Sequence, residues 1–230
     1  MLWSNLGFLG PFAPLAAMVI IGGGILLLSR IALVVWKWQR VLNTKALGHV
    51  LLQGARTDSI QLGQMCFIPT LILPLAAFDT GWIIWQYLTL YWVIITTVLL
   101  VFLELATPGF ITEYDVRPNR LFVEYLKYPK EVCSMLWRGF RIHVVLGVGL
   151  TALACWLIMQ YMAPWLSIQR SWGVLSTLAS WPLAIVLFAL IIRSSTGHRP
   201  ANPSMFAITS DAMVNSLILN SAWSVSYAIY

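Results

Sequence analysis

Apolar positions along the chain form two long blocks, and a charged stretch at residues 104–141 separates them. The blocks contain five runs that approach the roughly 20 apolar residues needed to span a bilayer. These runs are residues 14–36, 62–78, 82–103, 144–162 and 174–192. Pro69 and Pro74 interrupt the second run, so we expect a kinked or tilted helix there. The pattern predicts an all-α membrane protein with five transmembrane helices plus short amphipathic interfacial helices.

Aromatic and basic residues mark the expected ends of these runs. Five tryptophans lie near such ends: Trp36, Trp38, Trp82, Trp165 and Trp172. Tryptophan collects at membrane–water interfaces, so we expect these side chains to form an aromatic belt. Arg30 lies about a turn and a half inside the end of the first run. We expect its long side chain to reach outward to the interface.

Residues 43–54 have the pattern of a short amphipathic helix lying in the interface. Asn43 is a favourable N-cap and Gly54 a favourable C-terminal stop. Polar residues between them recur at spacings of three or four, and apolar residues occupy the opposite face. This predicts an interfacial helix near 43–54.

The charged stretch, residues 104–141, holds half of the chain's Lys, Arg, Asp and Glu residues. A Thr-Pro-Gly sequence indicates that the third span ends near Glu104. Residues 118–141 predict two interfacial helices, one beginning at Pro118 and the other at Pro129, because proline suits the first helical position. Each helix has a basic face opposite an aromatic and aliphatic face, which is typical of helices at a membrane surface.

The expected domain organisation is a five-helix transmembrane domain at 1–193, followed by an extracytoplasmic linker and the start of a helix at 194–230. The segment after Arg193 is polar and turn-rich, and Ser210 or Asp211 is expected to cap the last helix. The three cysteines are widely spaced and form no metal-ligand pattern or obvious disulfide pair. The net charge of +6 fits a protein that contacts anionic phospholipids, and we expect no nucleic-acid partner.

Four patches of sequence carry a resemblance to a known family. They are GARTD at 54–58, EYDVRPNR at 113–120, EYLKYPKEV at 124–132 and HRPANP at 198–203, with LILNS beyond at 217–221. In their order and spacing they resemble the N-terminal membrane domain of the lipoteichoic-acid-synthase-like, sulfatase-type phosphoglycerol and phosphoethanolamine transferases. The resemblance covers most of the chain.

This resemblance implies five transmembrane helices followed by an extracytoplasmic catalytic domain of the alkaline-phosphatase type. In the family that domain uses a threonine nucleophile beside a divalent metal, commonly manganese. The chain is expected to be the membrane half, so its partner would be a C-terminal catalytic domain, and we assign no catalytic residue, metal ligand or cofactor within it. The implied location is the bacterial cytoplasmic (inner) membrane, with a cytoplasmic N-terminus and an extracytoplasmic C-terminus.

The distribution of basic residues conflicts with that orientation. Twelve Lys and Arg residues lie on the side of residues 37–61, 105–141 and the tail, and Arg170 alone lies on the other. The positive-inside rule would place the basic side in the cytoplasm. We favour the orientation implied by the family, because four ordered motifs are more specific than a charge bias.

Candidate lipid-headgroup contacts follow from these patches and faces. They are Arg56, Asp58, Glu113, Tyr114, Asp115, Arg117, Arg120, Glu124, Tyr125, Lys127, Arg138, Arg193, His198 and Arg199. Arginine offers a fork suited to phosphate, acids can orient the guanidinium groups, and tyrosines suit the headgroup level. The alternative for each residue is an interfacial anchor or a partner in a helix-stabilising ion pair. Glu104 and His143, near expected span ends, are further candidates.

Two function classes stay open. The first is a membrane anchor and lipid-presenting domain of a metal-dependent headgroup transferase. The second is a non-enzymatic lipid-sensing or scaffold subunit, because some transferase-like proteins of this superfamily look like regulators. A transporter is disfavoured, since the spans show no charged pair near their centres and no evident inverted repeat.

Overall fold

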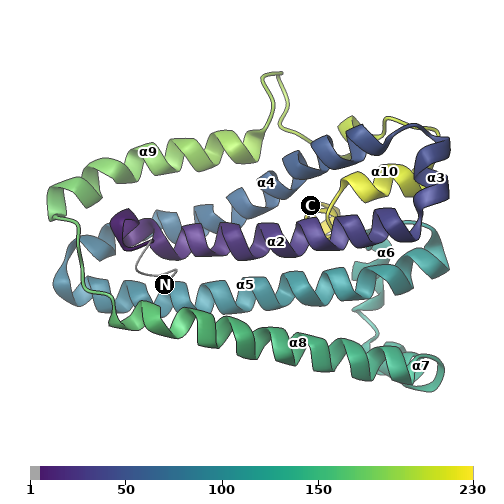
Figure 1. Cartoon of the computed structure of the whole chain (residues 1–230), viewed down its shortest axis with the longest axis horizontal. Coiled ribbons are helices and arrows are strands. Elements are labelled where there is room, and N and C mark those ends of the chain that lie inside the picture. Colours follow the sequence, from purple (N-terminus) through teal and green to yellow (C-terminus); the bar gives the residue numbers. More distant parts are fainter. Residues whose placement is uncertain (1–5, 230) are drawn as a thin grey trace. The chain divides into compact units, whose positions relative to one another are not determined.

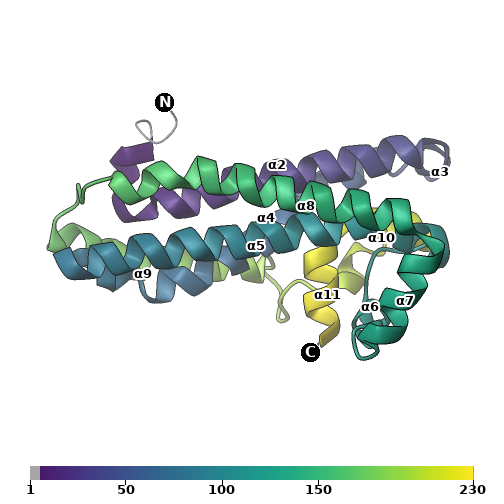
Figure 2. The same ribbon diagram turned by 90° about the horizontal axis from the view of Figure 1, so that it is seen from below.

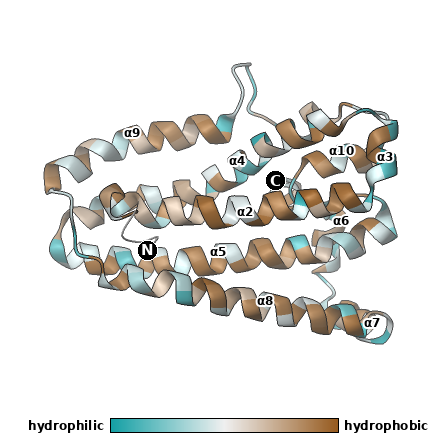
Figure 3. Cartoon of the chain, in the orientation of Figure 1, coloured by the Kyte–Doolittle hydropathy of each residue, from teal (hydrophilic) through white to brown (hydrophobic). Residues whose placement is uncertain are grey.

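The computed structural model describes residues 6–229, and every regular element in that range is a helix (Figure 1). Four helical stretches are long and apolar enough to cross a membrane: Gly7–Trp36, Asp79–Tyr114, Arg141–Ser167 and Val174–Arg193. Figure 3 shows hydrophobic residues along most of the visible length of α8 and α9. These stretches indicate a helical membrane protein.

The helices follow one another through the chain with short connections. The α-helices are α2 (Ala13–Trp36), α3 (Trp38–Asn43), α4 (Leu47–Leu71), α5 (Asp79–Tyr114), α6 (Arg120–Tyr125), α7 (Pro129–Gly139), α8 (Arg141–Met162), α9 (Val174–Arg193), α10 (Ala212–Ile218) and α11 (Ser221–Ile229). The 3-10 helices are η1 (Gly7–Phe12), η2 (Leu73–Ala77), η3 (Ala163–Ser167) and η4 (Pro203–Phe206).

The chain divides into two compact units. Unit 1 contains the described residues up to Gly24, together with Ser59–Val98 and Cys155–Pro200. Unit 2 contains Ile25–Asp58, Leu99–Ala154 and the described residues from Ala201 onward. Residues from 201 onward, expected to be part of a linker, therefore pack with parts of α2, α4 and α5 in unit 2.

Buried tryptophans hold unit 1 together. Trp82, Trp85 and Trp165 are 5 %, 0 % and 0 % exposed. Their indole N–H groups donate to Ile168 O at 3.0 Å, Pro11 O at 3.1 Å and Thr89 Oγ1 at 3.0 Å, respectively. A buried indole needs such an acceptor. The expected place of Trp82 and Trp165 in an aromatic belt is therefore wrong, because both are interior side chains.

The expected interfacial helix near 43–54 is also wrong. Asn43 ends α3 instead of capping a helix, and the chain turns at Lys45, whose φ is 53°. Helix α4 then begins at Leu47 and continues for 25 residues, straight through Gly54. The amphipathic segment and most of the second apolar run thus form one helix. That run is not among the four membrane-spanning candidates, so the expected fifth span is not confirmed.

The expected end of the third span near Glu104 is wrong as well. Helix α5 contains Pro108 and continues to Tyr114. Proline removes one backbone donor from the helix. Two nearby threonines bond to other carbonyls of the same helix. Thr107 and Thr112 donate to Leu103 O at 2.8 Å and Pro108 O at 2.9 Å. The helix ends just before Asp115, which adopts a left-handed φ of 55°.

The remaining boundaries lie close to the predicted ones. Helix α7 begins at Pro129 as expected, but α6 is shorter than expected and is capped by Asn119, whose side chain accepts from Leu121 N at 2.9 Å. Asp211 is the predicted cap of α10 and accepts from Met213 N at 2.9 Å. The last helical pattern is broken between α10 and α11, at residues 219–220.

Candidate functional site

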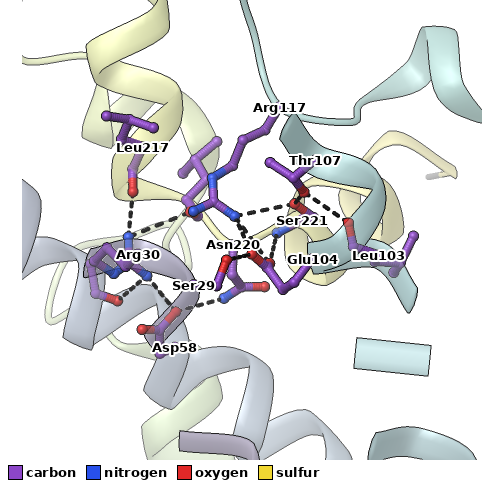
Figure 4. A network of polar contacts seen from close by, with 12 residues as sticks. Ser29, Arg30, Asp58, Leu103, Glu104, Thr107, Arg117, Leu217, Asn220 and Ser221 are labelled. Carbon is purple, nitrogen blue, oxygen red and sulfur yellow. Dashed lines mark hydrogen bonds and ion pairs between the residues drawn. The ribbon is translucent and has the colours of Figure 1, made fainter. Parts of the chain in front are cut away.

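A buried network of charged side chains connects five segments of unit 2, and Arg30 of α2 is one of its centres (Figure 4). Arg30 is 1 % exposed and forms an ion pair with Asp58 of α4 at 2.5 Å. Its guanidinium also donates to the carbonyl oxygens of Leu217 and Ile218, the latter at 2.8 Å. Because these carbonyls belong to the last turn of α10, Arg30 caps that helix. The expectation that Arg30 reaches outward to the interface is wrong.

Gly54 allows this approach of Arg30. The guanidinium donates to Gly54 O at 3.1 Å, and a Cβ atom at residue 54 would lie only 2.5 Å from Arg30 Nε. Any other residue would displace the arginine. Gly54 is therefore required by a contact between α2 and α4, and it does not end a helix.

Glu104 and Arg117 form the second ion pair of the network. Arg117 Nη1 lies 2.8 Å from Glu104 Oε2, and the two residues are 2 % and 7 % exposed. Glu104 also accepts from the Ser29 hydroxyl and, at 2.9 Å, from Ser221 N. Ser221 Oγ accepts from Arg117 at 3.2 Å and hydrogen-bonds to Thr107 Oγ1 at 2.6 Å. The pair thus binds the first residue of α11 to α5.

Asn220 lies at the joint between α10 and α11 (residues 219–220) and bonds to Asp58 of the first ion pair, while its neighbour Ser221 bonds to both members of the second. The Asn220 amide donates to Asp58 Oδ1 and to Thr57 O, each at 3.2 Å, and its side-chain oxygen accepts from Trp223 N at 2.8 Å. Thr57 Oγ1 donates to Ile218 O at 2.7 Å. Residues 217–221 are therefore held by α2, α4 and α5 together.

The network contains two cations and two anions that are paired with one another. Breaking one member of a buried ion pair leaves an uncompensated charge and typically costs about 3–5 kcal/mol. We call the two ion pairs, Arg30–Asp58 and Glu104–Arg117, together with residues 217–221 that they hold, the clamp. Its geometry indicates a structural role. Among residues 6–229 no group of three or more His, Cys, Asp or Glu side chains is placed to hold a metal ion.

A second, exposed cluster lies around Arg40 of α3. Its guanidinium forms two 2.6 Å hydrogen bonds with Asp115 and a 2.5 Å ion pair with Asp211. The hydrogen bonds from Arg40 lower the pKa of Asp115. At Asp211 burial opposes the shift, but hydrogen bonds from Arg40 and from the backbone of α10 outweigh it, so the pKa is lowered there too. The two aspartates in turn raise the pKa of Arg40.

The structure does not gather the predicted headgroup contacts into one site. Asp58 and Arg117 are buried in the clamp, and Asp115 is paired with Arg40. The other candidates with contacts form small local groups: Tyr114 with Tyr125 (2.6 Å), Arg120 with Glu124 (3.2 Å), Arg56 over the Phe206 ring (5.5 Å), and Arg193 with Ser195 O (3.1 Å). Exposed side chains include Glu113, Lys127, Arg138, His198 and Arg199.

Sequence reasoning missed Arg30, Arg40 and Asn220 as members of these clusters. One signal was present for Arg30, because an ionisable residue inside an apolar run is a functional candidate by default. The others have partners far away in the sequence, which no local pattern reveals. Arg40 and Asp211, for example, are 171 positions apart.

Helix α7 presents a surface that nothing in unit 2 covers. Met135, Leu136 and Trp137 are 55 %, 37 % and 54 % exposed, and Lys130 and Arg138 are exposed beside them. Helix α7 ends at Gly139, immediately before the membrane-spanning candidate that begins with α8. Its amphipathic surface is therefore tied covalently to the end of that candidate span.

No protein-family model matches the chain, and no solved structure matches it significantly.

Proposed function

We propose that the chain is the membrane anchor and lipid-presenting domain of an extracytoplasmic, metal-dependent phosphoglycerol or phosphoethanolamine transferase of the sulfatase type. The lipid-presenting part of this proposal rests on the exposed surface of α7. The transferase part is supported by the four sequence patches, and manganese would be held by the catalytic domain and not by this chain.

The chemistry of α7 fits the headgroup layer of a membrane. Exposed apolar side chains beside basic ones are unfavourable in water, but they suit an interface where acyl chains and phosphates lie at neighbouring depths. Arg141 Nε donates to Trp137 O at 2.9 Å, which fixes the start of α8 to the last turn of α7. Arg138 offers a guanidinium fork for a lipid phosphate, and Lys130 adds a second positive charge.

We further propose that α4 is the fifth membrane crossing. Its 25 residues extend about 37 Å, which exceeds the roughly 30 Å hydrocarbon core. Its polar residues lower its mean hydropathy, but Thr57, Asp58, Gln61 and Thr70 are buried within the protein. Polar side chains are tolerated at membrane depth when they face protein instead of lipid. Five crossings would put the segments before α2 and after α9 on opposite sides, and in the proposed orientation the segment after α9 is extracytoplasmic.

The lipid contact is tested with the whole chain in nanodiscs of phosphatidylcholine, with or without phosphatidylglycerol. Lipids that co-purify with the protein are quantified by mass spectrometry. Each basic residue near a charged surface contributes about 1 kcal/mol, so Lys130→Gln and Arg138→Gln should each lower the preference for phosphatidylglycerol by up to about fivefold.

Lys45→Gln is the matched control, because Lys45 is also an exposed basic residue but lies outside α7 and is not a candidate headgroup contact. An unchanged preference in both α7 variants would refute the lipid contact. The transferase part is tested separately, by asking whether the full-length gene product releases the headgroup of phosphatidylglycerol or phosphatidylethanolamine in the presence of Mn²⁺.

One observation favours the non-enzymatic alternative, a lipid-sensing or scaffold subunit. The clamp holds α11 against the same loop that leads to α6 and α7, which would suit transmission of a lipid signal. A full-length protein that binds phosphatidylglycerol but releases no headgroup would favour this alternative.

A further inference from the structure

We infer that lipid binding at α7 restrains helix α11, and that the loop of residues 115–119 and the α10–α11 joint transmit this effect. We call this connection the coupling. The inference rests on the proposed function for the contact between α7 and lipid. It adds a consequence of that contact, namely that lipid composition controls how firmly α11 is held.

The buried half of the coupling is the pair formed by Glu104 and Arg117. Arg117 belongs to the 115–119 loop, and both members of the pair also hydrogen-bond to Ser221, at 2.9 and 3.2 Å. Displacing the loop therefore removes a hydrogen bond from the first residue of α11 and leaves the Glu104 carboxylate with fewer donors. Such a buried pair has few alternative geometries, so the loop and the joint are expected to move together.

The exposed half of the coupling is Arg40. Its two terminal nitrogens donate to Asp115, which lies at one end of the loop. Its Nε forms an ion pair with Asp211, the N-cap of α10. A single side chain thus connects the loop with the helix pair, independently of the buried network. Because Asp115 is also the residue whose left-handed conformation ends α5, its position sets where the loop begins.

The path from the loop to α7 is short. Asn119 caps α6, which has six residues, and only residues 126–128 separate α6 from α7. Helix α6 also packs against α11 (Figure 2). A lipid contact that restrains α7 therefore also restrains α6 and the loop, and through them α11. By linkage, α11 restrains α7 to the same extent.

Hydrogen–deuterium exchange of the whole chain in nanodiscs tests the coupling. The parent is compared in phosphatidylcholine alone and in phosphatidylcholine with phosphatidylglycerol. We expect the anionic lipid to slow exchange of the amides of both α7 and α11, in α11 by about fivefold or more, the lower end of usual coupling energies. In Arg40→Gln, which leaves the buried pair in place, the slowing should persist in α7 and become smaller in α11.

The control variant is Lys45→Gln, which removes the same charge from an exposed residue of unit 2 that is not one of the contacts of Arg40 and should keep both responses. Asp115→Asn is a second variant that weakens the same contact from the other partner and should act like Arg40→Gln. If α7 responds in the parent and α11 does not, or if the α11 response of Arg40→Gln equals that of the parent, the coupling is refuted while the lipid contact stands. If α7 itself does not respond, the lipid contact is wrong and the coupling falls with it.

Discussion

Single residues of the clamp have structural roles that their residue type would not suggest. Arg30 uses one terminal nitrogen for the carbonyls that end α10 and the other for Asp58 and Gly54 O. A charge in an apolar run is tolerable because every strong interaction it forms is with protein. The buried guanidinium also restricts the neighbouring residues, because their side chains must leave room for it.

Gly54 is one residue restricted in this way, and it gives the first prediction. In an ordinary helix interior, Gly→Ala stabilises by up to about 1 kcal/mol. At Gly54 the new Cβ would overlap Arg30, so Gly54→Ala should instead destabilise the protein by about 2 kcal/mol or more. Gly109→Ala is the matched control, since a methyl group at that position of α5 would meet nothing within 4 Å. Thermal unfolding in detergent compares the two, and equal shifts would contradict the assigned role of Gly54.

The Arg40 cluster predicts a pH dependence. Asp115 and Asp211 have lowered pKa values in the folded protein, so they bind protons less readily than in the unfolded chain. Their contribution to stability is present above the usual aspartate pKa of about 3.9 and is lost as the pH falls through the lowered values. Arg40 and Asp115 are 40 % and 53 % exposed, so solvent screening limits the effect to about 1 kcal/mol or less. Unfolding midpoints measured from pH 6 to about pH 3 should fall less steeply in Arg40→Gln than in the parent.

At the scale of elements, local signals predicted some helices well and failed for others. Pro129 predicted the start of α7, and the apolar run at 174–192 predicted α9 almost to its ends. The ends of α4 and α5 were mispredicted because Gly54 and Pro108 are common stop signals. Here Gly54 accommodates Arg30, and α5 continues through Pro108 to Tyr114. The clamp itself was beyond prediction, since Arg30 and Leu217 are 187 positions apart.

Helix α6 gives the prediction at this scale. With six residues it is too short to be stable by propensity alone, and Asn119 provides its N-terminal hydrogen bond. Asn119→Ala should lose about 1 kcal/mol of local stability, whereas Asn119→Asp should retain it because aspartate caps equally well. Hydrogen exchange at Leu121 and its neighbours reports the difference. Equal exchange in the two variants would show that packing against α11, and not the cap, holds α6.

At the scale of the whole molecule, the decisive question is whether α4 crosses the membrane. If it does, residues before α4 and residues at the start of α5 lie on opposite sides; if it does not, they lie on the same side. Asn43, Thr80 and His198 are exposed positions that sample the segment before α4, the start of α5 and the segment after α9. The exposed Cys133 and the half-buried Cys155 would be changed to serine first, leaving the buried Cys66.

Single cysteines at these three positions, treated with a membrane-impermeant maleimide in intact cells, give the final prediction. With α4 crossing and an extracytoplasmic C-terminus, Asn43→Cys and His198→Cys should react while Thr80→Cys should not. Equal reaction at residues 43 and 80 would mean that α4 stays on one side, since nothing else separates them. Reaction at residue 80 alone would keep the five crossings but reverse the orientation. The basic side would then face the cytoplasm as the charge distribution favours, and an extracytoplasmic transferase domain after α11 would be ruled out.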